Sequence, residues 1–350
     1  MVSRPIRVAG AGPSGLSAAI TLALAGVPVE VYERGPAPGS RHHFDLQGID
    51  NWSSGGDIVD GLRALGFSLD CPLYPVREVH LMRGASHPVL ARSDLPFTYL
   101  VQRGAGPGTL DDALRRQAES LGVPIHCRRP LSRDEADVWA TGPPAAFGVV
   151  YGYNFRTQHP AISVGLVDER LAPGGYVYLL VAGGQGTLAV LVLRSFKEVR
   201  RRLEESRALL ERRFDLDMRE VRPFGGIGYF EIPDRRSRGA LRVGEAGGFQ
   251  DGLFGFGIRM AFVSGHLAAR SLIERRPFDE LCQAEVGGLM RASWTNRLLF
   301  ELTGDFGHRY LIRGLRSLGP RAFLARLYRF GPSKRLLYPL ARALLARPSS

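Results

Sequence analysis

The chain has 350 residues, 45% hydrophobic and 23% charged, which is the composition of a globular protein with a sizeable core. Its three cysteines, Cys71, Cys127 and Cys282, are far apart and form no CxxC pair, which argues against a disulfide-rich secreted scaffold, a zinc site and a dithiol–disulfide reductase. The chain enters an apolar strand at once and has no apolar run of about 18 residues, so neither a signal peptide nor a transmembrane helix is expected. We therefore expect a cytoplasmic protein without a metal site.

The first predicted elements form a βαβ unit. Residues 6–9 are a short apolar strand, and 16–25 form an apolar helix that Gly26 ends. Residues 27–33 alternate between apolar and polar side chains, as a second strand does.

A glycine motif joins the first strand to the helix. It is Gly10-x-Gly12-x-x-Gly15, and Glu33 closes the second strand. In such a motif the first glycine permits a tight turn, the second lets the backbone approach a pyrophosphate, and the third packs the helix on the strand. The helix N-terminus attracts the anion, and the acidic residue accepts the ribose hydroxyls. The unit predicts a dinucleotide site.

The rest of the chain divides into further helices and strands. Residues 35–54 are rich in Gly, Pro, Ser and His and predict a long loop. Helical patterns are expected at 57–65, 109–121, 197–214, 257–274 and in everything after Pro277, and strands at 76–82, 88–91, 98–102, 123–127, 136–140, 149–155, 161–166, 175–181, 187–193 and 240–245. The strands from 149 to 193 suggest an antiparallel sheet, and the glycines at 183–186 a hairpin turn rather than a second nucleotide site.

A late segment separates FAD from NAD as the cofactor. Residues 241–249 end a strand, and 250–258 open a helix. An NAD domain has no use for this segment, whereas a flavin extends beyond the pyrophosphate and needs it. Glu245 can hold the ribityl hydroxyls, and the helix start at 255–258 can face the flavin N1–C2=O edge and stabilise negative charge.

The two motifs together resemble the para-hydroxybenzoate-hydroxylase superfamily of FAD proteins, and within it the geranylgeranyl reductase family. Residues 244–258 match a GDAAGFxxPxxGxGI-like segment, and Arg103 with 109–111 matches an Arg followed by an Asp-containing helix start. The segment 140–142 is similar to an Ala-x-Gly turn beside the cofactor, and 175–180 stands at a YxWxFP-like motif. The resemblance covers roughly residues 1–275 and implies that Arg103 contacts the FAD.

Several residues depart from the reductase pattern. Glu245 replaces the usual Asp, Gly252 the usual Pro, and Tyr178 and Val181 the Trp and Pro of the substrate-domain motif. The loop 39–44 lacks the cysteine that many reductases carry. FAD binding remains the expectation, and isoprenoid specificity is the weaker inference.

These inferences give a fold class and a set of boundaries. We expect an α/β protein with a Rossmann-type FAD-binding domain, an inserted β-rich substrate domain and a C-terminal helical extension. The discontinuous FAD-binding domain comprises 1–70, 98–145 and 235–275, the substrate domain 71–97 and 146–234, and the basic helical region 276–350.

Most of the expected site residues contact the cofactor. These are Gly10, Gly12, Pro13, Ser14, Gly15, Glu33, Arg34, Arg103, Thr141, Gly142, Glu245, Gly255, Phe256, Gly257 and Ile258. Tyr176 and Tyr178 share one face of a strand, and with Phe254 and Phe256 they are expected to line a substrate pocket over the flavin, ordinary core packing being the alternative.

No catalytic residue is identified, and four side chains are weak candidates. His42 and His43 lie on a loop that can reach the flavin and titrate near neutral pH, although solvated loop histidines are the plainer interpretation. Tyr176 and Tyr178 are the other two. Asp251 is either a turn residue or a polar pocket group.

The leading function is reduction of carbon–carbon double bonds in an isoprenoid or lipid-like substrate by hydride from flavin N5. The alternatives are an FAD-dependent monooxygenase of a hydrophobic or aromatic substrate and a non-catalytic flavin-binding protein; a halogenase is disfavoured because its WxWxIP motif is missing. With no second nucleotide domain, the electron donor is a transient NAD(P)H or an electron-carrier protein.

The net charge of +12 is concentrated in the tail. From Arg309 onward there are ten Lys or Arg residues and no Asp or Glu, so removing ten charges leaves the other 308 residues near +2. Residues 309–350 interleave these charges with Leu, Tyr and Phe, which favours an anionic membrane surface, at the inner face of the membrane. Nucleic-acid binding is the less favoured rival, and a solvated helical face is the plainest alternative.

Overall fold

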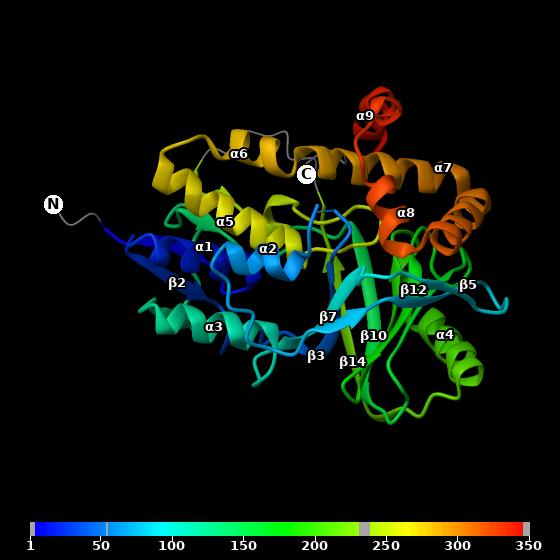
Figure 1. Cartoon of the computed structure of the whole chain (residues 1–350). Helices are drawn as coiled ribbons and strands as arrows, with labels where there is room; N and C mark the ends of the chain where they lie inside the picture. The colour runs from blue at the N-terminus through cyan, green and yellow to red at the C-terminus, as the bar shows by residue number, and fades with distance from the viewer. Residues whose placement is uncertain (1–3, 54, 231–238, 346–350) are drawn as a thin grey trace.

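The computed structural model describes residues 4–53, 55–230 and 239–345. A parallel sheet with its helices forms one end of the molecule, and a larger sheet forms the other (Figure 1). The C-terminal helices lie across both parts (Figure 1). The α/β class with a Rossmann-type core, a β-rich second part and C-terminal helices is therefore confirmed.

The parallel sheet has the strand order β15-β9-β1-β2-β8. Its strands are β1 (Ile6–Ala9), β2 (Val29–Glu33), β8 (Ile125–Cys127), β9 (Val138–Trp139) and β15 (Leu241–Arg242). Val8 and Val31 are fully buried, because helices cover both faces of such a sheet. The predicted strand 240–245 is shorter than expected, since a 3₁₀ turn (Gly244–Gly247) follows β15 directly.

Four helices belong to this part. They are α1 (Pro13–Leu24), α2 (Ile58–Ala64), α3 (Leu110–Ser120) and α5 (Ile258–Glu274). Helices α1 and α5 cross at close range, because a Cβ placed on Gly265 would lie 2.1 Å from the Ser14 carbonyl oxygen. The small residue lets the start of α1 and the late FAD segment lie side by side.

The larger sheet has seven strands in the order β14-β10-β13-β12-β11-β5-β6. They are β5 (Glu78–Arg83), β6 (Val89–Arg92), β10 (Gly148–Arg156), β11 (Ile162–Val167), β12 (Tyr176–Ala182), β13 (Gln185–Val192) and β14 (Arg219–Gly228). The pairs are antiparallel except β11 with β5. Helix α4 (Val199–Phe214) covers one face, burying Leu203 and Leu210 in its core.

The hairpin between β12 and β13 confirms the predicted turn, with φ of +58° at Gly183 and +74° at Gly184. Strand β14 was not predicted. Pro223 and three glycines hide its pattern, and it tolerates them because it is an edge strand.

A three-stranded sheet, β3-β7-β4, joins the two parts. It consists of β3 (His43–Asp50), β7 (Thr98–Gly104) and β4 (Tyr74–Val76). The prediction of a loop over 35–54 is therefore wrong for β3, whose buried Leu46 and Ile49 make enough core contact to hold a strand among polar neighbours. Because β4 pairs with β7, a sheet crosses the predicted boundary at 71–97, and the domain limits stay a prediction.

The C-terminal region is part of the folded body. It comprises α6 (Phe278–Glu285), α7 (Gly287–Leu318), α8 (Pro320–Leu327) and α9 (Pro332–Leu345), and α7 bends at Gly304, where φ is +48° and ψ is −126°. Phe300, Leu311 and Phe323 share a buried cluster with Trp52 and Leu100. Among the described helices none combines the length and apolar character that a membrane span requires.

Candidate functional site

Three glycines shape the turn between β1 and α1. Gly10 has φ of +99°, and a Cβ there would lie 2.3 Å from the Ala140 carbonyl oxygen. A Cβ on Gly15 would lie 1.9 Å from the Gly10 carbonyl oxygen. By contrast, no described atom lies within 4 Å of a Cβ placed on Gly12. Gly10 and Gly15 thus allow close packing, whereas Gly12 borders open space in front of the helix, where a pyrophosphate fits.

The residues around this space suit an anion and a ribose. Pro13 is the first residue of α1, and Ser14 follows it in the first turn, where backbone N–H groups have no helical partner. Glu33 accepts hydrogen bonds from the amides of Ala11 (2.8 Å) and Gly35 (2.6 Å), which orient its carboxylate beside the cradle. Arg34 is exposed and makes no ion pair with a described residue.

The late segment meets the same cradle from the other side. A Cβ on Gly244 would lie 2.5 Å from Ser14 Oγ, so the strand end touches the start of α1. Glu245 follows, and burial raises the pKa of its carboxyl, opposed by the charges of Arg41 and Arg103. Gly257 then caps α5, whose first residue is Ile258.

Arg41 is a site residue that the sequence analysis missed. Its Nη2 atom lies 3.6 Å from Glu245 Oε2, and its Nη1 atom lies 3.1 Å from the position of a Cβ on Gly142. The side chain therefore spans the gap between the turn at Thr141–Gly142 and the late segment. An exposed arginine in a loop carries no sequence signal for this position.

A buried polar network lies next to Arg41. The Arg103 guanidinium donates to both Asp111 oxygens (2.7 and 2.9 Å) and to Gln47 Oε1 (2.9 Å). Gln47 in turn donates to Asp45 Oδ2 (2.7 Å), and His42 Nδ1 lies 3.0 Å from the same oxygen. The structure thus places Arg103 in an ion pair with Asp111 beside the site, and its expected contact with FAD stays a prediction.

The network sets the charge states of its members. Burial, reinforced by the charge of Arg103, lowers the pKa of His42 and favours its neutral form. Burial alone would raise the pKa of Asp45, but the hydrogen bond with His42 and the charge of Arg103 hold it below its usual range. Burial would also raise the pKa of Asp111, but the charge and hydrogen bonds of Arg103 hold it below its usual range. The His43 side chain is exposed at the start of β3, and only its backbone amide contacts the network, by donating to Asp45 Oδ1 (3.1 Å).

Aromatic side chains gather where β12 meets the loop before α5. Tyr176 and Tyr178 on β12 have ring centroids 5.9 Å apart, and the Tyr176 hydroxyl donates to the Phe254 carbonyl oxygen (2.5 Å). Phe254 lies edge-on to Tyr176, at 6.2 Å. Phe256 instead packs edge-on against Trp52, at 4.8 Å. Tyr176, Tyr178 and Phe254 come together, whereas Phe256 faces the C-terminal helices.

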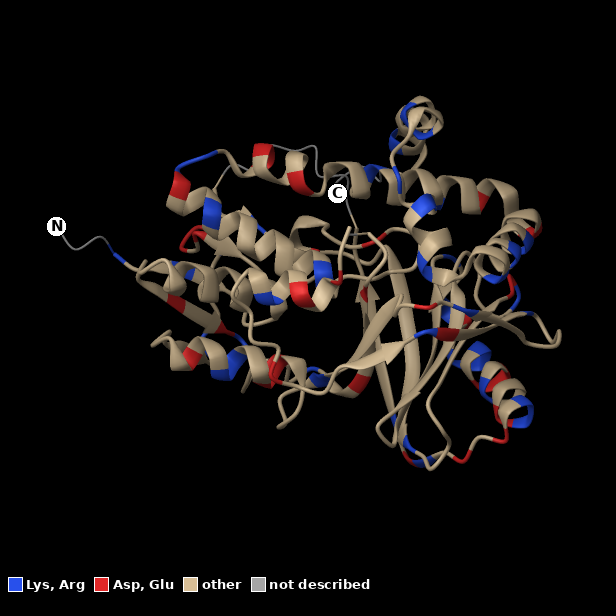
Figure 2. Ribbon diagram, in the orientation of Figure 1, with Lys and Arg blue, Asp and Glu red and all other residues tan. Residues whose placement is uncertain are grey.

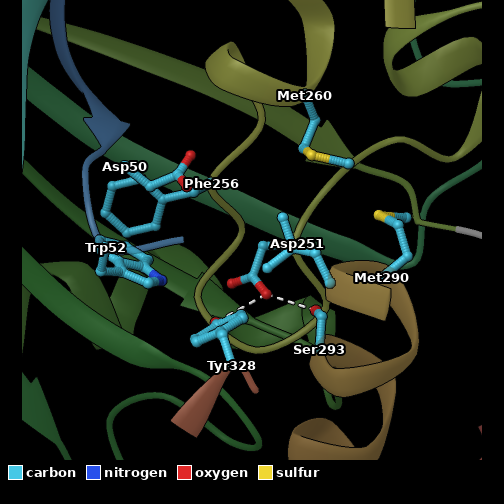
Figure 3. Close-up of a pocket in the computed structure, with 9 residues that line it drawn as sticks. Asp50, Trp52, Asp251, Phe256, Met260, Met290, Ser293 and Tyr328 are labelled. Atoms are coloured by element: carbon cyan, nitrogen blue, oxygen red, sulfur yellow. Dashed lines mark hydrogen bonds between the residues drawn. The ribbon is translucent and has the colours of Figure 1, made fainter. Parts of the chain in front are cut away.

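Asp251 lies in the loop before α5, beside a cavity of about 20 Å³ (Figure 3). Its carboxylate accepts hydrogen bonds from Ser293 Oγ, from the Tyr328 hydroxyl (2.8 Å) and from the Phe254 amide (2.6 Å). Burial raises the pKa of Asp251, and these donors oppose the shift. The cavity is large enough for about one water molecule and has Trp52 at its side. Asp251 is thus a buried group that fastens the loop to α7 and α8; nothing in the sequence identified Ser293 or Tyr328.

The comparisons agree with this geometry. A sequence model of the NAD(P)-binding Rossmann-like domain matches residues 8–48. The structure is similar to a geranylgeranyl bacteriochlorophyll reductase-like protein from Thermoplasma acidophilum, with a TM-score of 0.72, 15% identity, and 96% of this chain and 98% of the other covered. The chain has the fold of the FAD-dependent oxidoreductases of the para-hydroxybenzoate-hydroxylase superfamily.

Other proteins with similar structures are enzymes of different reactions. The p-nitrophenol 4-monooxygenase PnpA from Pseudomonas putida has a TM-score of 0.56 and 16% identity, covering 90% of this chain and 98% of the other. CmlS, a flavin-dependent halogenase, has a TM-score of 0.56 and 15% identity, covering 97% of this chain and 76% of the other. No curated protein matches the chain in sequence.

The residues present fit an FAD. The open space at Gly12 would accept the pyrophosphate, Glu33 would hold the adenosine ribose and Glu245 the ribityl chain, and the N-terminus of α5 would stabilise negative charge on the flavin. The fold and the cradle are therefore compatible with a bound FAD. Within the described chain, no three His, Cys, Asp or Glu side chains form a cluster that could hold a metal ion.

Proposed function

We propose that this protein is an FAD-dependent reductase of carbon–carbon double bonds in an isoprenoid or lipid-like substrate. The fold comparison carries the proposal: the TM-score is 0.72 with the geranylgeranyl bacteriochlorophyll reductase-like protein and 0.56 with the monooxygenase and the halogenase. The bound FAD would supply the hydride.

An aromatic cluster beside the late FAD segment supports an apolar substrate. Tyr176, Tyr178 and Phe254 are partly buried and face one another next to the late FAD segment. Contact between this surface and a hydrocarbon stabilises the complex by roughly 25 cal/mol per Å² of apolar area removed from water. An apolar substrate matches this cluster better than a polar molecule does.

Tyr178 is the best candidate for the proton donor. Burial, with the charge of Asp45, raises the pKa of its phenol, so the group keeps its proton at neutral pH. The Tyr176 hydroxyl is already bonded to the Phe254 carbonyl, whereas that of Tyr178 makes no hydrogen bond to a described residue. In this proposal the Tyr178 proton goes to the substrate carbon, and water restores it.

The electron donor and the location complete the proposal. No second nucleotide motif is found in the sequence, so NAD(P)H would visit the flavin transiently, or an electron-carrier protein would reduce it. Cys71, Cys127 and Cys282 are free thiols, which suits the reducing cytoplasm.

The experiment uses purified protein whose flavin has been reduced without oxygen. Addition of a geranylgeranyl-bearing lipid should reoxidise the flavin and yield a product with two more hydrogen atoms for each double bond reduced. Oxygen uptake stimulated by an aromatic or hydrophobic substrate, with one oxygen atom added to the product, would instead establish the monooxygenase. A flavin that no donor reduces would favour the non-catalytic alternative.

The role of Tyr178 has its own test. Tyr178→Phe should lower kcat by on the order of 100-fold or more with little change in KM, because only the proton is lost. Tyr176→Phe, the matched control, should keep most of the activity. Equal activity of Tyr178→Phe and wild type across the pH range would contradict the assignment.

A further inference from the structure

A groove of about 440 Å³ lies between the C-terminal half of α7 and the paired strands β5 and β6. It lies at the end of the molecule opposite α1, away from the glycine cradle (Figure 1). Leu81, Val89 and Ile312 contribute apolar side chains to its lining. The groove thus has an apolar lining that none of the proposed redox chemistry uses.

Arginines surround this apolar lining. Arg309, Arg313 and Arg316 are spaced i, i+4 and i+7, so they follow one side of α7, and Arg83 faces them from β5. Arg83 pairs with Asp305 at 2.9 Å, but the three α7 arginines form no ion pair with a described residue. Figure 2 shows basic residues along this end of α7 and on α8 and α9. Three positive charges at the groove therefore lack a counter-charge.

Exposed apolar side chains adjoin these arginines. Leu302, Phe306 and Tyr310 are 64%, 72% and 56% exposed, and the latter two stand one turn apart on α7. Large apolar groups left in water beside unpaired cations mark a surface that another phase or molecule covers. The combination has the amphipathic character of an interfacial membrane segment.

We propose that this groove binds the phosphate headgroup of an anionic membrane lipid, while Phe306 and Tyr310 enter the interface. The arginines match the phosphate, and the apolar lining matches the glycerol and upper acyl carbons. A nucleic-acid duplex would use the arginines but leave the aromatic side chains in water, and a free anion would use neither apolar surface. The proposal does not depend on which reaction the flavin performs.

Cosedimentation of the full-length, FAD-loaded protein with vesicles tests it. Wild type should bind phosphatidylcholine vesicles that contain phosphatidylglycerol, bind pure phosphatidylcholine much more weakly, and be partly released by salt. Arg309→Gln/Arg313→Gln/Arg316→Gln should weaken binding to the anionic vesicles by on the order of 100-fold. Inorganic phosphate at equal ionic strength to the salt control should displace no more protein than that salt does.

The control variant removes three charges elsewhere. Arg133, Arg212 and Arg275 are exposed, form no ion pair with a described residue and lie outside the groove. Arg133→Gln/Arg212→Gln/Arg275→Gln should bind vesicles like wild type, although its net charge equals that of the groove variant. Equal loss in both triple variants would show that net charge alone drives binding and would overturn the groove.

A second variant tests the apolar part. Phe306→Ser/Tyr310→Ser should reduce vesicle binding while changing the thermal midpoint little, because both side chains are exposed and only Tyr310 loses a ring contact, with Phe323. Leu336→Ser/Leu340→Ser/Leu344→Ser alters the other exposed apolar stripe, on α9, and should have the smaller effect. The proposal would be refuted if the arginine triple variant and Phe306→Ser/Tyr310→Ser bound vesicles fully while the α9 variant lost binding. Binding of wild type to duplex DNA and not to vesicles would also refute it.

Discussion

Gly12 and Gly15 lie three residues apart in one turn, yet their surroundings differ. A side chain on Gly12 would meet no described atom within 4 Å, whereas one on Gly15 would overlap the Gly10 carbonyl oxygen. The φ of Gly12 is −80°, which any residue adopts. The space beside Gly12 is therefore open to a ligand, whereas the packing of the turn itself requires Gly15.

We expect Gly12→Val to fold normally and to lose FAD, because the valine fills the space of the pyrophosphate. Gly15→Val should lower the stability of the protein itself. Far-UV circular dichroism, the thermal midpoint and bound flavin per protein measure both effects. A folded Gly12→Val protein with full flavin occupancy would contradict the proposed cradle.

Arg103 and Asp111 form a fully buried, bidentate ion pair. Removing the cation alone leaves the carboxylate buried without its partner, so Arg103→Met should lower the free energy of unfolding by about 3–5 kcal/mol. Arg103→Met/Asp111→Asn should cost less, because the amide oxygen still accepts from the Gly104 amide. Urea denaturation of wild type, the two single variants and the double variant measures the coupling between Arg103 and Asp111. Equal losses of stability in Arg103→Met and in the double variant would contradict this coupling.

At the scale of elements, Asp251 connects the flavin-side loop to two helices. Ser293 belongs to α7, and Tyr328 follows α8 directly. The C-terminal helices therefore hold the loop that precedes α5, and with it the expected position of the flavin ring.

Tyr328→Phe should lower the free energy of unfolding by about 1–3 kcal/mol, because Asp251 loses a donor while it stays buried. It should also raise the Kd for FAD, since the loop is less firmly held. Tyr310→Phe makes the same chemical change at an exposed tyrosine and should have an effect below about 0.5 kcal/mol. Tyr328→Phe should therefore differ from Tyr310→Phe in both stability and FAD affinity. Equal values for the two variants would contradict the proposal that Asp251 holds the loop in place.

At the scale of the whole molecule, two segments far apart in sequence build one cradle. The glycine turn comes from residues 10–15 and the late segment from 244–258, and α1 and α5 bring them together through Gly265. The larger sheet contributes Tyr176 and Tyr178, and the C-terminal helices contact the loop before α5 through Asp251.

The intact protein should therefore purify yellow, with non-covalently bound FAD. Heat release followed by chromatography should identify FAD and not FMN or NAD, because the cradle has places for the adenosine ribose, the pyrophosphate and the ribityl chain. A folded preparation that takes up no FAD when the cofactor is added would refute the assignment.

The sequence by itself determined the local features of this protein. The spacing of Gly10, Gly12 and Gly15 and the apolar runs around them specified β1, α1 and β2, because a tight turn and a helix start depend on neighbouring residues. The glycine pair at 183–184 specified the β12–β13 turn for the same reason. The pairing of early and late motifs indicated FAD.

Only the tertiary structure decided which distant side chains meet. Strand β3 lies in a segment rich in loop-forming residues, and its pairing with β7 and its buried Leu46 hold it extended. Arg41, Ser293 and Tyr328 carry no local signal, and their roles come from partners more than 40 residues away, at Glu245 and Asp251. The basic tail likewise has the pattern of one amphipathic stretch in sequence. The fold buries its Phe323 and Tyr328 and leaves its Tyr310 exposed beside the groove, because packing against the sheet, not periodicity, selects the buried face.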